Sequence, residues 1–433
     1  MRRVLVTGLG VITPVGCGRD EFFGNLLAGK SGIRRLTADF APQLLARVFG
    51  EVDFDGAARF PKPKLALLDR FTQFALAAAG EAFADAGIEA ADPFLARAGV
   101  YVGTSVGGNQ TLEAGYAELF AAGKDRLPPY TVMRAMNNAA AAHISMDYQL
   151  RGPSLTYSTA CSSSAIAIGE AARAIRHGII DLAIAGGAES MLTLGTIRAW
   201  EALRTLATEE PGDPGASCRP FSLDRTGLVL GEGAAMVILE NEDHARARGR
   251  RGYAELCGYG VSSDASHLTK PSRDGQCRAI RMALSDANLA PERIGYINAH
   301  GTATLAGDVV ETEAIKEVFG AHAGRVPVSS TKSMHAHLMG AAGAVEFIAA
   351  VLALKSGSLP PTMNLRVPDP ECDLDYIPNA ARKATGVEAV MSNSFAFGGS
   401  NAVLVACQPE RDVALPELPQ VHPGKVAVAN RVR

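Results

Sequence analysis

The chain carries two histidines two places apart in the stretch KSMHAHLMGAAGA, residues 332–344. In an extended segment, His335 and His337 would point to the same face, which is the arrangement of a possible metal pair. No cysteine or carboxylate cluster stands beside them in the sequence, and a metal site would need such further ligands. The small residues 341–343 let backbones approach closely, so the residue just before them is expected at a packed centre. Metal binding is therefore disfavoured.

Cys161 stands in STACSSSAIAIGEAAR, just ahead of a stretch of small residues that predicts a helix with a buried start. A thiol at a helix N-terminus feels the positive end of the helix dipole and nearby unpaired N–H groups. Both favour the nucleophilic thiolate. The same N–H groups could stabilise a developing oxyanion. The alternative is a buried structural cysteine, and this motif by itself does not decide between the two.

His300 ends a predicted strand in YINAHGTATLAGD, where the following loop could present its side chain to a cleft. Thr302 and Thr304 follow at period two. A lone histidine is more often structural than catalytic, so this stretch alone leaves both interpretations open.

Two motif matches are set aside. Gly8-Leu9-Gly10 follows a strand, but a dinucleotide-binding fingerprint needs a third glycine where Thr13 stands. Residues 103–107, GTSVG, match the nucleophile elbow of α/β-hydrolases, yet no clear buried helix follows them.

Apolar strands alternate with alanine-rich helical stretches, which predicts an α/β fold. RRVLVTGLGVITP is similar to GYAELCGYGVSSD, and TACSSSAIAIGEAARAIRHG is similar to MHAHLMGAAGAVEFIAAVLALKSG. This duplication predicts two similar halves, residues 1–250 with Cys161 and residues 251–408 with His300 and His337. Residues 409–433 contain four prolines and predict a loosely ordered tail.

Composition excludes several classes of function. The chain has 433 residues, 47% of them hydrophobic, and a net charge of −3, which gives no reason to expect nucleic acid as a partner. The longest apolar run, AVEFIAAVLAL, is too short to span a bilayer and contains Glu346. The seven cysteines are scattered and form no CxxC pair, so we expect neither zinc nor disulfides, and a cytoplasmic location.

Taken together, the motifs resemble those of the β-ketoacyl-acyl-carrier-protein synthases, condensing enzymes of the thiolase superfamily. The similarity runs from MRRVLVTGLGVITPVG through LRGPSLTYSTACSSS, AGGAES, GLVLGEGA, NAHGTAT, STKSM and HLMGAAGAVE to SNSFAFGGSNAVLV. The elongating, synthase-II-like branch fits best. The resemblance implies a thiolase fold with a layered αβαβα core of two similar halves.

The resemblance also implies a reaction. An acyl group on a cysteine thioester condenses with malonyl-acyl-carrier protein in a decarboxylating Claisen reaction that gives 3-oxoacyl-acyl-carrier protein and CO2. The product serves fatty-acid, polyketide or polyene chain elongation. No metal and no dissociable cofactor are implied, because phosphopantetheine arrives on the acyl carrier protein. The chain is expected to form a homodimer, or a heterodimer with a chain-length-factor-like subunit.

Residue roles follow by resemblance. Cys161 matches the nucleophile, and His300 and His337 match the two catalytic histidines, with His335 as a neighbour where threonine is usual and Ala336 in place of a usual glycine. Lys332 matches a buried lysine, and Glu311 matches its acidic partner. Phe397 matches a gating phenylalanine whose backbone N–H joins that of the nucleophile in an oxyanion hole. Thr302 and Thr304 match two threonines that bind the pantetheine arm.

Other positions depart from the family pattern. Trp200, the only tryptophan, and Val106 fall at positions that line the acyl pocket in the family. The Trp200 indole would either shorten the acyl tunnel or have only a structural packing role.

Four residues are predicted to contact the pantetheine arm or the acidic carrier protein: Lys62, Lys64, Thr269 and Lys270.

Three alternatives to a fatty-acid synthase remain. The chain could be the catalytic subunit of a specialised type II polyketide heterodimer, or a non-catalytic chain-length partner, although such partners lack the nucleophile. A thiolase-like degradative enzyme would carry a second reactive cysteine near the C-terminal glycine loop, where Phe397, Gly398 and Gly399 stand instead.

Overall fold

The computed structural model describes residues 2–89 and 92–409. Most of the predicted tail, residues 409–433, therefore lies outside the described residues. The predicted boundary near residue 250 falls between α10 (Glu242–Ala247) and β9 (Ala254–Ser263).

Each half contributes a set of five strands to one mixed sheet, and the two sets have the same order and directions. An eleventh, two-residue strand pairs at one edge of the first set. In space the first set runs β6–β5–β7–β8–β1 and the second runs β11–β10–β14–β15–β9. In both sets the first three strands run parallel to one another, and each of the last two pairs in antiparallel fashion with the strand before it. The halves meet where β1 pairs with β9 at Leu5 and Val6.

The strands of the first half are β1 (Val4–Thr13), β5 (Gly99–Gly103), β6 (Ser154–Tyr157), β7 (Leu182–Glu189) and β8 (Gly233–Asn241). Those of the second are β9, β10 (Ile294–Asn298), β11 (Val328–Ser329), β14 (Ala389–Phe395) and β15 (Ser400–Cys407). Five short strands complete the set: β2 (Gly16–Cys17), β3 (Arg34–Arg35), β4 (Val48–Phe49), β12 (Ser358–Leu359) and β13 (Arg382–Lys383).

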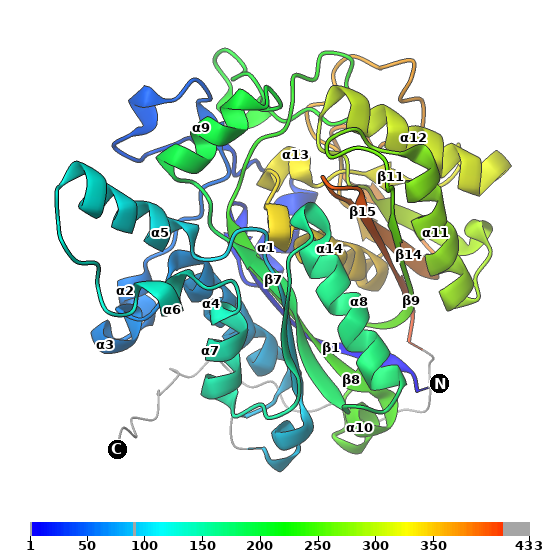
Figure 1. The fold of residues 1–433 in the computed structure, drawn as a ribbon. Coiled ribbons are helices and arrows are strands. Elements are labelled where there is room, and N and C mark those ends of the chain that lie inside the picture. Colours follow the sequence, from blue (N-terminus) through cyan, green and yellow to red (C-terminus); the bar gives the residue numbers. More distant parts are fainter. Residues whose placement is uncertain (1, 90–91, 410–433) are drawn as a thin grey trace.

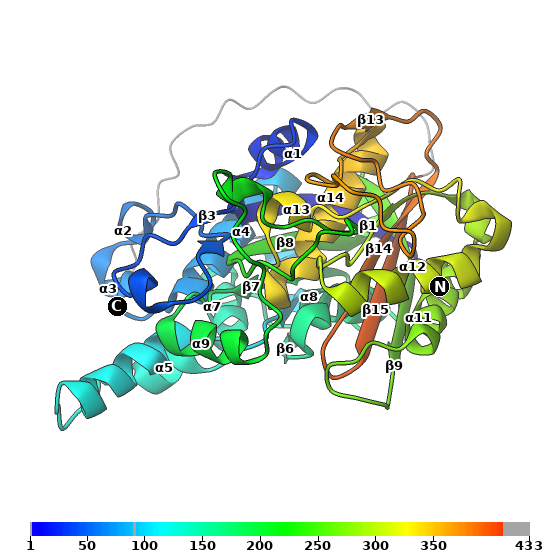
Figure 2. The same ribbon diagram turned by 90° about the horizontal axis from the view of Figure 1, so that it is seen from above.

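Helices fill three layers around these strands (Figures 1 and 2). α8 (Ser163–Arg176) and α14 (Ala342–Ser356) pack on each other and on strands of both halves, so they form the central layer. α4 (Arg70–Ala86) and α7 (Ala139–Tyr148) cover the first half from outside. α11 (Arg273–Ala287), with α12 (Leu305–Phe319) beside it, covers the second half. This is the layered αβαβα arrangement expected from the sequence.

Seven further helices lie at the periphery: α1 (Arg19–Leu27), α2 (Gly56–Arg59), α3 (Lys62–Leu65), α5 (Asn109–Tyr116), α6 (Thr131–Ala135), α9 (Leu194–Ala202) and α10. The short α13 (Lys332–His335) is completely buried.

The repeated glycine pairs serve packing. A Cβ on Gly10 would collide with the Ala78 carbonyl oxygen of α4, and one on Gly260 would collide with the Ala279 carbonyl oxygen of α11. Each pair thus lets an outer helix lie directly on the first strand of its half. The match to a dinucleotide fingerprint is accounted for by this close contact.

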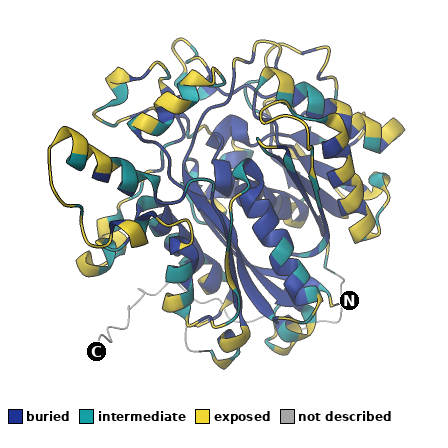
Figure 3. Cartoon of the chain, viewed as in Figure 1, coloured by how far each residue is buried: buried dark blue, intermediate teal, exposed yellow. Residues whose placement is uncertain are grey.

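The largest buried apolar cluster lies in the central layer, whose helices are mostly dark blue in Figure 3. Two further clusters lie under the outer helices of the first and the second half. Every residue of α14 from Ala342 to Leu354 is buried. The segment Met339–Ser356 is long and apolar enough to cross a bilayer, but 89% of it is buried inside the protein. It is therefore a core helix, because its apolar surface is already covered by the two sheets.

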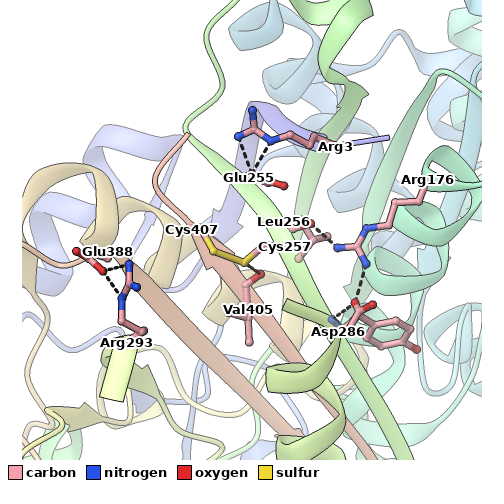
Figure 4. Close-up of a disulfide and its surroundings, with 11 residues drawn as sticks. Arg3, Arg176, Glu255, Leu256, Cys257, Asp286, Arg293, Glu388, Val405 and Cys407 are labelled. Atoms are coloured by element: carbon pink, nitrogen blue, oxygen red, sulfur yellow. Dashed lines mark hydrogen bonds and ion pairs between the residues drawn. A yellow bond between two sulfur atoms is a disulfide. The ribbon is translucent and has the colours of Figure 1, made fainter. Parts of the chain in front are cut away.

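Cys257 in β9 and Cys407 at the end of β15 form a disulfide (Figure 4). The scattered cysteines predict no disulfide, and that prediction is wrong for this pair. The two residues are 150 positions apart, and only the antiparallel register of β15 on β9 brings them together. Sequence spacing does not reveal such a pairing.

Candidate active site

Cys161 lies at the start of the central layer, in the short 3-10 turn Ala160–Ser162 that leads into α8. Ala160, just before it, has a φ of +50°, so the chain turns sharply before the helix begins. Only 5% of Cys161 is exposed. The sulfur lines a cavity of about 300 Å³.

His337 contacts the Cys161 sulfur directly. Its Nε2 lies 3.0 Å from Sγ, and its Nδ1 accepts a hydrogen bond from the Met339 backbone N–H at 3.3 Å. Because Nδ1 is the acceptor, the ring proton is on Nε2 and faces the sulfur. The His337 backbone is itself held by Val229 and Gly231. The ring is thus fixed as a hydrogen-bond donor to the cavity.

His300 follows β10 and faces the same cavity, with its ring centroid 5.4 Å from that of His337. The Lys332 Nζ lies 3.4 Å from its Nδ1 and donates to its backbone oxygen at 2.6 Å. An ammonium only donates, so Nδ1 is the acceptor and Nε2 carries the proton. Both imidazoles therefore present an N–H to the space beside the sulfur.

Burial sets the charge of these three groups. It lowers the pKa of His300 and of His337 well below the usual value, helped in both cases by the Lys332 cation. Both rings are neutral at pH 7. Burial raises the pKa of Cys161 to about 12, against the opposing effects of Lys332 and of the backbone N–H groups of Phe397 and Cys161. The expected resting thiolate is therefore corrected to a thiol, because loss of solvation outweighs the helix N-terminus.

Lys332 is completely buried, and its ion-pair partner is Glu346 of α14, which is also completely buried. The sequence led us to expect Glu311 in this role. Glu311 instead accepts the backbone N–H groups of His300 and Gly301, at 2.9 and 2.7 Å. It fixes the loop that carries His300, while Glu346 balances the lysine charge. The prediction of a carboxylate partner was right and its identity was wrong.

His335 is buried and lies outside the cavity. Its Nδ1 donates to the Ala336 carbonyl oxygen at 2.7 Å, and its Nε2 accepts from the Thr331 hydroxyl at 3.0 Å. Burial lowers its pKa to about 3. The two histidines do not share an extended segment, because His335 ends α13 and Ala336 has a φ of +65°. That turn directs the two rings apart.

Most residues singled out from the sequence line the cavity: Cys161, Trp200, Thr269, Lys270, His300, Thr302, Thr304, Glu311, His337 and Phe397. The Thr302 and Thr304 hydroxyls are 3.0 Å apart, whereas Thr269 and Lys270 are exposed. Val106 packs in the apolar cluster beside Cys161 rather than on the cavity wall.

Phe397 contributes to the cavity with both its backbone and its ring. Its backbone N–H favours the ionised form of the Cys161 sulfur and so opposes the rise of the pKa of Cys161. Its ring stacks on Trp200, with centroids 5.9 Å apart and an angle of 21° between the planes. The following residues, Gly398 and Gly399, have φ of +84° and +75°, a conformation that favours glycine.

Lys62 and Lys64 both lie on α3 and do not line the cavity. Lys62 is exposed, and Lys64 forms an ion pair with Asp147 of α7. The charge of Lys64 is therefore partly neutralised within the protein.

The sulfur of Cys161 and one ring nitrogen each of His300 and His337 all lie within 4.8 Å of one another, so by distance alone they could hold a metal ion. The donor set fits a metal poorly. Both rings direct a protonated nitrogen into the cavity and offer no lone pair there. The Lys332 ammonium behind His300 adds a repulsive charge.

Glu346 and Glu189 are two of the buried carboxylates to which the sequence analysis gave no role. Glu189 lies at the end of β7 and accepts the backbone N–H groups of Ser105 and Gly340 at 2.7 and 3.0 Å. It joins the loop of Val106 to the turn after His337. The signal for both was available, since each is a single acidic residue inside an apolar run.

Two family models match the chain in succession. The β-ketoacyl synthase N-terminal domain matches residues 1–245, and the β-ketoacyl synthase C-terminal domain matches residues 253–366. The chain belongs to the β-ketoacyl synthase family. The resemblance drawn from the sequence motifs is confirmed.

Known proteins with similar sequences and structures support the same family. The 3-oxoacyl-[acyl-carrier-protein] synthase 2 of Coxiella burnetii (strain RSA 493 / Nine Mile phase I) is 43% identical over 407 residues, which cover 93% of this chain and 98% of that protein. The solved ishigamide ketosynthase/chain length factor is 37% identical with a TM-score of 0.88, covering 94% of this chain and 100% of that one. A type II polyketide synthase acyl-carrier protein in complex with its ketosynthase, bound to the hexaketide, matches with a TM-score of 0.86 and 34% identity, over 94% of this chain and 100% of that one.

The thiolase-type fold is therefore confirmed, and the chain is an acyltransferase-class ketosynthase of fatty-acid or polyketide chain elongation.

Proposed function

We propose that Cys161, His300 and His337 together carry out a decarboxylating Claisen condensation between an acyl group and a malonyl unit, both delivered by acyl carrier protein. The main support is the meeting of three groups from distant parts of the chain. The Cys161 sulfur lies 3.0 Å from His337 Nε2, and the His300 ring stands beside that of His337, with both N–H groups facing the cavity.

In the first step the Cys161 sulfur attacks the carbonyl carbon of the incoming acyl thioester. The backbone N–H groups of Cys161 and Phe397 would stabilise the oxyanion. The bond to the pantetheine sulfur then breaks, and the leaving sulfur takes the proton given up by Cys161. The acyl group remains on Cys161 as a thioester.

In the second step a malonyl thioester enters and its bond to the carboxylate breaks, releasing CO2. The electron pair forms an enolate, whose oxygen accepts the N–H groups of His300 and His337. Loss of one such donor costs about 2.7–4 kcal/mol of barrier in other enzymes. The enolate carbon attacks the acyl carbonyl, the carbon–sulfur bond to Cys161 breaks, and the 3-oxoacyl chain leaves on the carrier. The Cys161 sulfur leaves as a thiolate and takes one proton from water, which restores the thiol.

Substrate delivery is assigned to the mouth of the cavity. Thr302 and Thr304 hydrogen-bond the pantetheine arm, Thr269 and Lys270 approach its phosphate end, and Lys62 and Lys64 contact the acidic carrier protein. No metal or dissociable cofactor takes part, because phosphopantetheine arrives with the carrier. Carrier binding by wild type should be more sensitive to salt than binding by Lys270→Ala, and equal sensitivity would remove Lys270 from this role.

A second subunit is proposed on the face formed by β6 and the α5–α6 region. β6 is an edge strand of the sheet with Leu155 exposed. The α5 region projects from the body (Figures 1 and 2) and exposes Phe120 and Met133. Exposed apolar side chains beside an unpaired strand edge favour a protein partner. We propose a second copy of this chain there, in a cytoplasmic enzyme without membrane or nucleic-acid contacts.

The reaction is tested by incubating the enzyme with malonyl-carrier protein and a panel of acyl-carrier proteins, then reading product masses. We expect masses that correspond to 3-oxoacyl-carrier proteins two carbons longer than the donors. Cys161→Ala should form none, while Cys218→Ala, which removes a buried cysteine that does not line the cavity, should resemble wild type. Product from Cys161→Ala would overturn the assignment.

The alternative is the catalytic subunit of a type II polyketide heterodimer, which the similarity to the ishigamide ketosynthase/chain length factor favours. Light scattering on the purified chain distinguishes the two, because a homodimer forms without a partner. A non-catalytic role is tested by adding a partner chain to the Cys161→Ala protein. Activity restored by that mixture would place the chemistry elsewhere.

A further inference from the structure

Arg225 lies in the segment that leads into β8, and its side chain is only 3% exposed. It does not line the cavity. Its guanidinium instead reaches beneath the loop that carries Thr302 and Thr304.

The guanidinium holds this loop by its backbone. Nε donates to the Thr304 carbonyl oxygen at 3.2 Å, and Nη2 donates to that of Leu305 at 2.9 Å. Nη1 donates to the Ser222 carbonyl oxygen at 2.9 Å and to the Asp369 carboxylate at 2.5 Å. A planar guanidinium can serve these acceptors at once, whereas a lysine ammonium on a flexible stem cannot reproduce the fork.

Asp308 of α12 holds the same loop from its other side. Its Oδ1 accepts the Ala303 backbone N–H at 3.1 Å, and its Oδ2 accepts that of Phe221 at 2.8 Å. Arg225 Nε lies 3.7 Å from the same carboxylate. Ala303 has a φ of +65°, so the turn between the two threonines depends on such support.

The two side chains therefore hold one backbone group in each of three successive residues: the Ala303 N–H and the carbonyl oxygens of Thr304 and Leu305. The Thr302 and Thr304 hydroxyls project from this fixed backbone, 3.0 Å apart, on the wall of the cavity. A shift of the backbone at residues 303–305 would move both hydroxyls relative to Cys161. The His300 backbone is held separately, by Glu311 and Lys332.

We propose that Arg225 is a positioning residue for the pantetheine arm: it holds the two threonines at the place where they bind the arm's amide groups. This inference rests on the proposed function, in which Thr302 and Thr304 contact pantetheine. Arg225 touches neither substrate nor the reacting atoms, so its effect belongs to substrate binding rather than to the chemical step.

The test compares two acyl donors for acylation of Cys161, an acyl-pantetheine and the S-ethyl thioester of the same acyl group, which lacks every amide of the arm. We expect Arg225→Lys to raise KM for acyl-pantetheine by about tenfold, because that factor corresponds to the loss of one or two hydrogen bonds. The kcat of this variant should stay within about twofold of the wild-type value. Acylation by the S-ethyl thioester should change by less than about twofold.

Controls separate positioning from folding. Arg219→Lys changes another buried arginine of the same segment, which bonds Glu210 and the Asp224 carbonyl oxygen but not the loop, and should leave both donors unaffected. Asp369→Asn keeps Arg225 but removes its carboxylate partner, and should raise KM for acyl-pantetheine by a smaller factor. Thermal unfolding of each variant checks that the fold is kept.

Equal losses with both donors, or no loss with either, in folded Arg225→Lys would overturn the proposal. Thr302→Val tests the proposed function separately. If this variant leaves KM for acyl-pantetheine unchanged, the threonine assignment itself is wrong. If it raises KM while Arg225→Lys does not, the threonines bind the arm and only the role of Arg225 fails.

Discussion

Lys332 and Glu346 form an ion pair in which neither side chain is exposed, directly behind His300. The lysine also donates to the His300 carbonyl oxygen and stands at its Nδ1. Glu346 therefore balances the cation that fixes the tautomer of His300. A charge in this position is tolerable only with its partner present.

Glu346→Ala is expected to destabilise the protein by about 3–5 kcal/mol, because it leaves the Lys332 charge buried and unpaired. Urea unfolding measures this loss. The double variant Lys332→Met, Glu346→Leu should recover much of the stability but not the condensation activity. Wild-type stability of the single variant would show that the pair is not as buried as described.

Alkylation of Cys161 tests its protonation state. Since burial raises the pKa of Cys161 to about 12, the thiolate fraction grows with pH over the whole accessible range. The rate of reaction with iodoacetamide, read from the mass of the Cys161 peptide, should rise about tenfold per pH unit between about pH 7 and 10. A rate that levels off near neutral pH would mean that the helix N-terminus outweighs burial.

Replacement of Trp200 should change acyl-chain preference. The indole stacks on Phe397 and occupies part of the cavity wall, so Trp200→Ala opens space and should shift the preferred acyl donors to longer chains. Trp200→Phe keeps an aromatic partner and should shift less. An unchanged profile of products in Trp200→Ala would assign the indole to packing alone. Because Trp200 is the only tryptophan, fluorescence of the wild type should also respond to acylation.

Ala336→Gly should stabilise the protein. Ala336 has φ of +65° and ψ of −175°, a region that essentially only glycine occupies without strain. Relief of this strain should raise the free energy of unfolding by about 1–3 kcal/mol. Glycine also makes the unfolded chain more flexible, which lowers this gain by about 0.4–1 kcal/mol. Thermal unfolding measures the gain. Ala341→Gly, at an ordinary helical conformation with φ of −85°, should destabilise instead. A lower midpoint in Ala336→Gly would contradict the prediction.

Thiol counting tests the disulfide. Protein purified and denatured without reductant should show five reactive thiols, those of Cys17, Cys161, Cys218, Cys277 and Cys372. Cys407→Ser should expose one more, that of Cys257. Seven thiols in the wild type before reduction would show that the pair is not joined in solution.

Local sequence patterns were sufficient for the elements and for the reactive residue types. Cys161 and His337 each precede a helix of small residues, and both helices lie in the central layer as that pattern implied. His337 rather than His335 faces the cavity, in agreement with its place before the run of small residues. These features depend on neighbours within a few residues of each other, which is why the sequence reports them.

The sequence by itself determined the family, the layered α/β fold and the set of residues that meet around Cys161. Only the tertiary structure decided that Glu346 rather than Glu311 pairs with Lys332, that Cys257 bonds Cys407, and that the Cys161 thiol is protonated at rest. The reason is physical: ion pairing, disulfide formation and desolvation depend on strand register and on burial in three dimensions. Residues far apart in the chain set both, and no local pattern records which of them will meet.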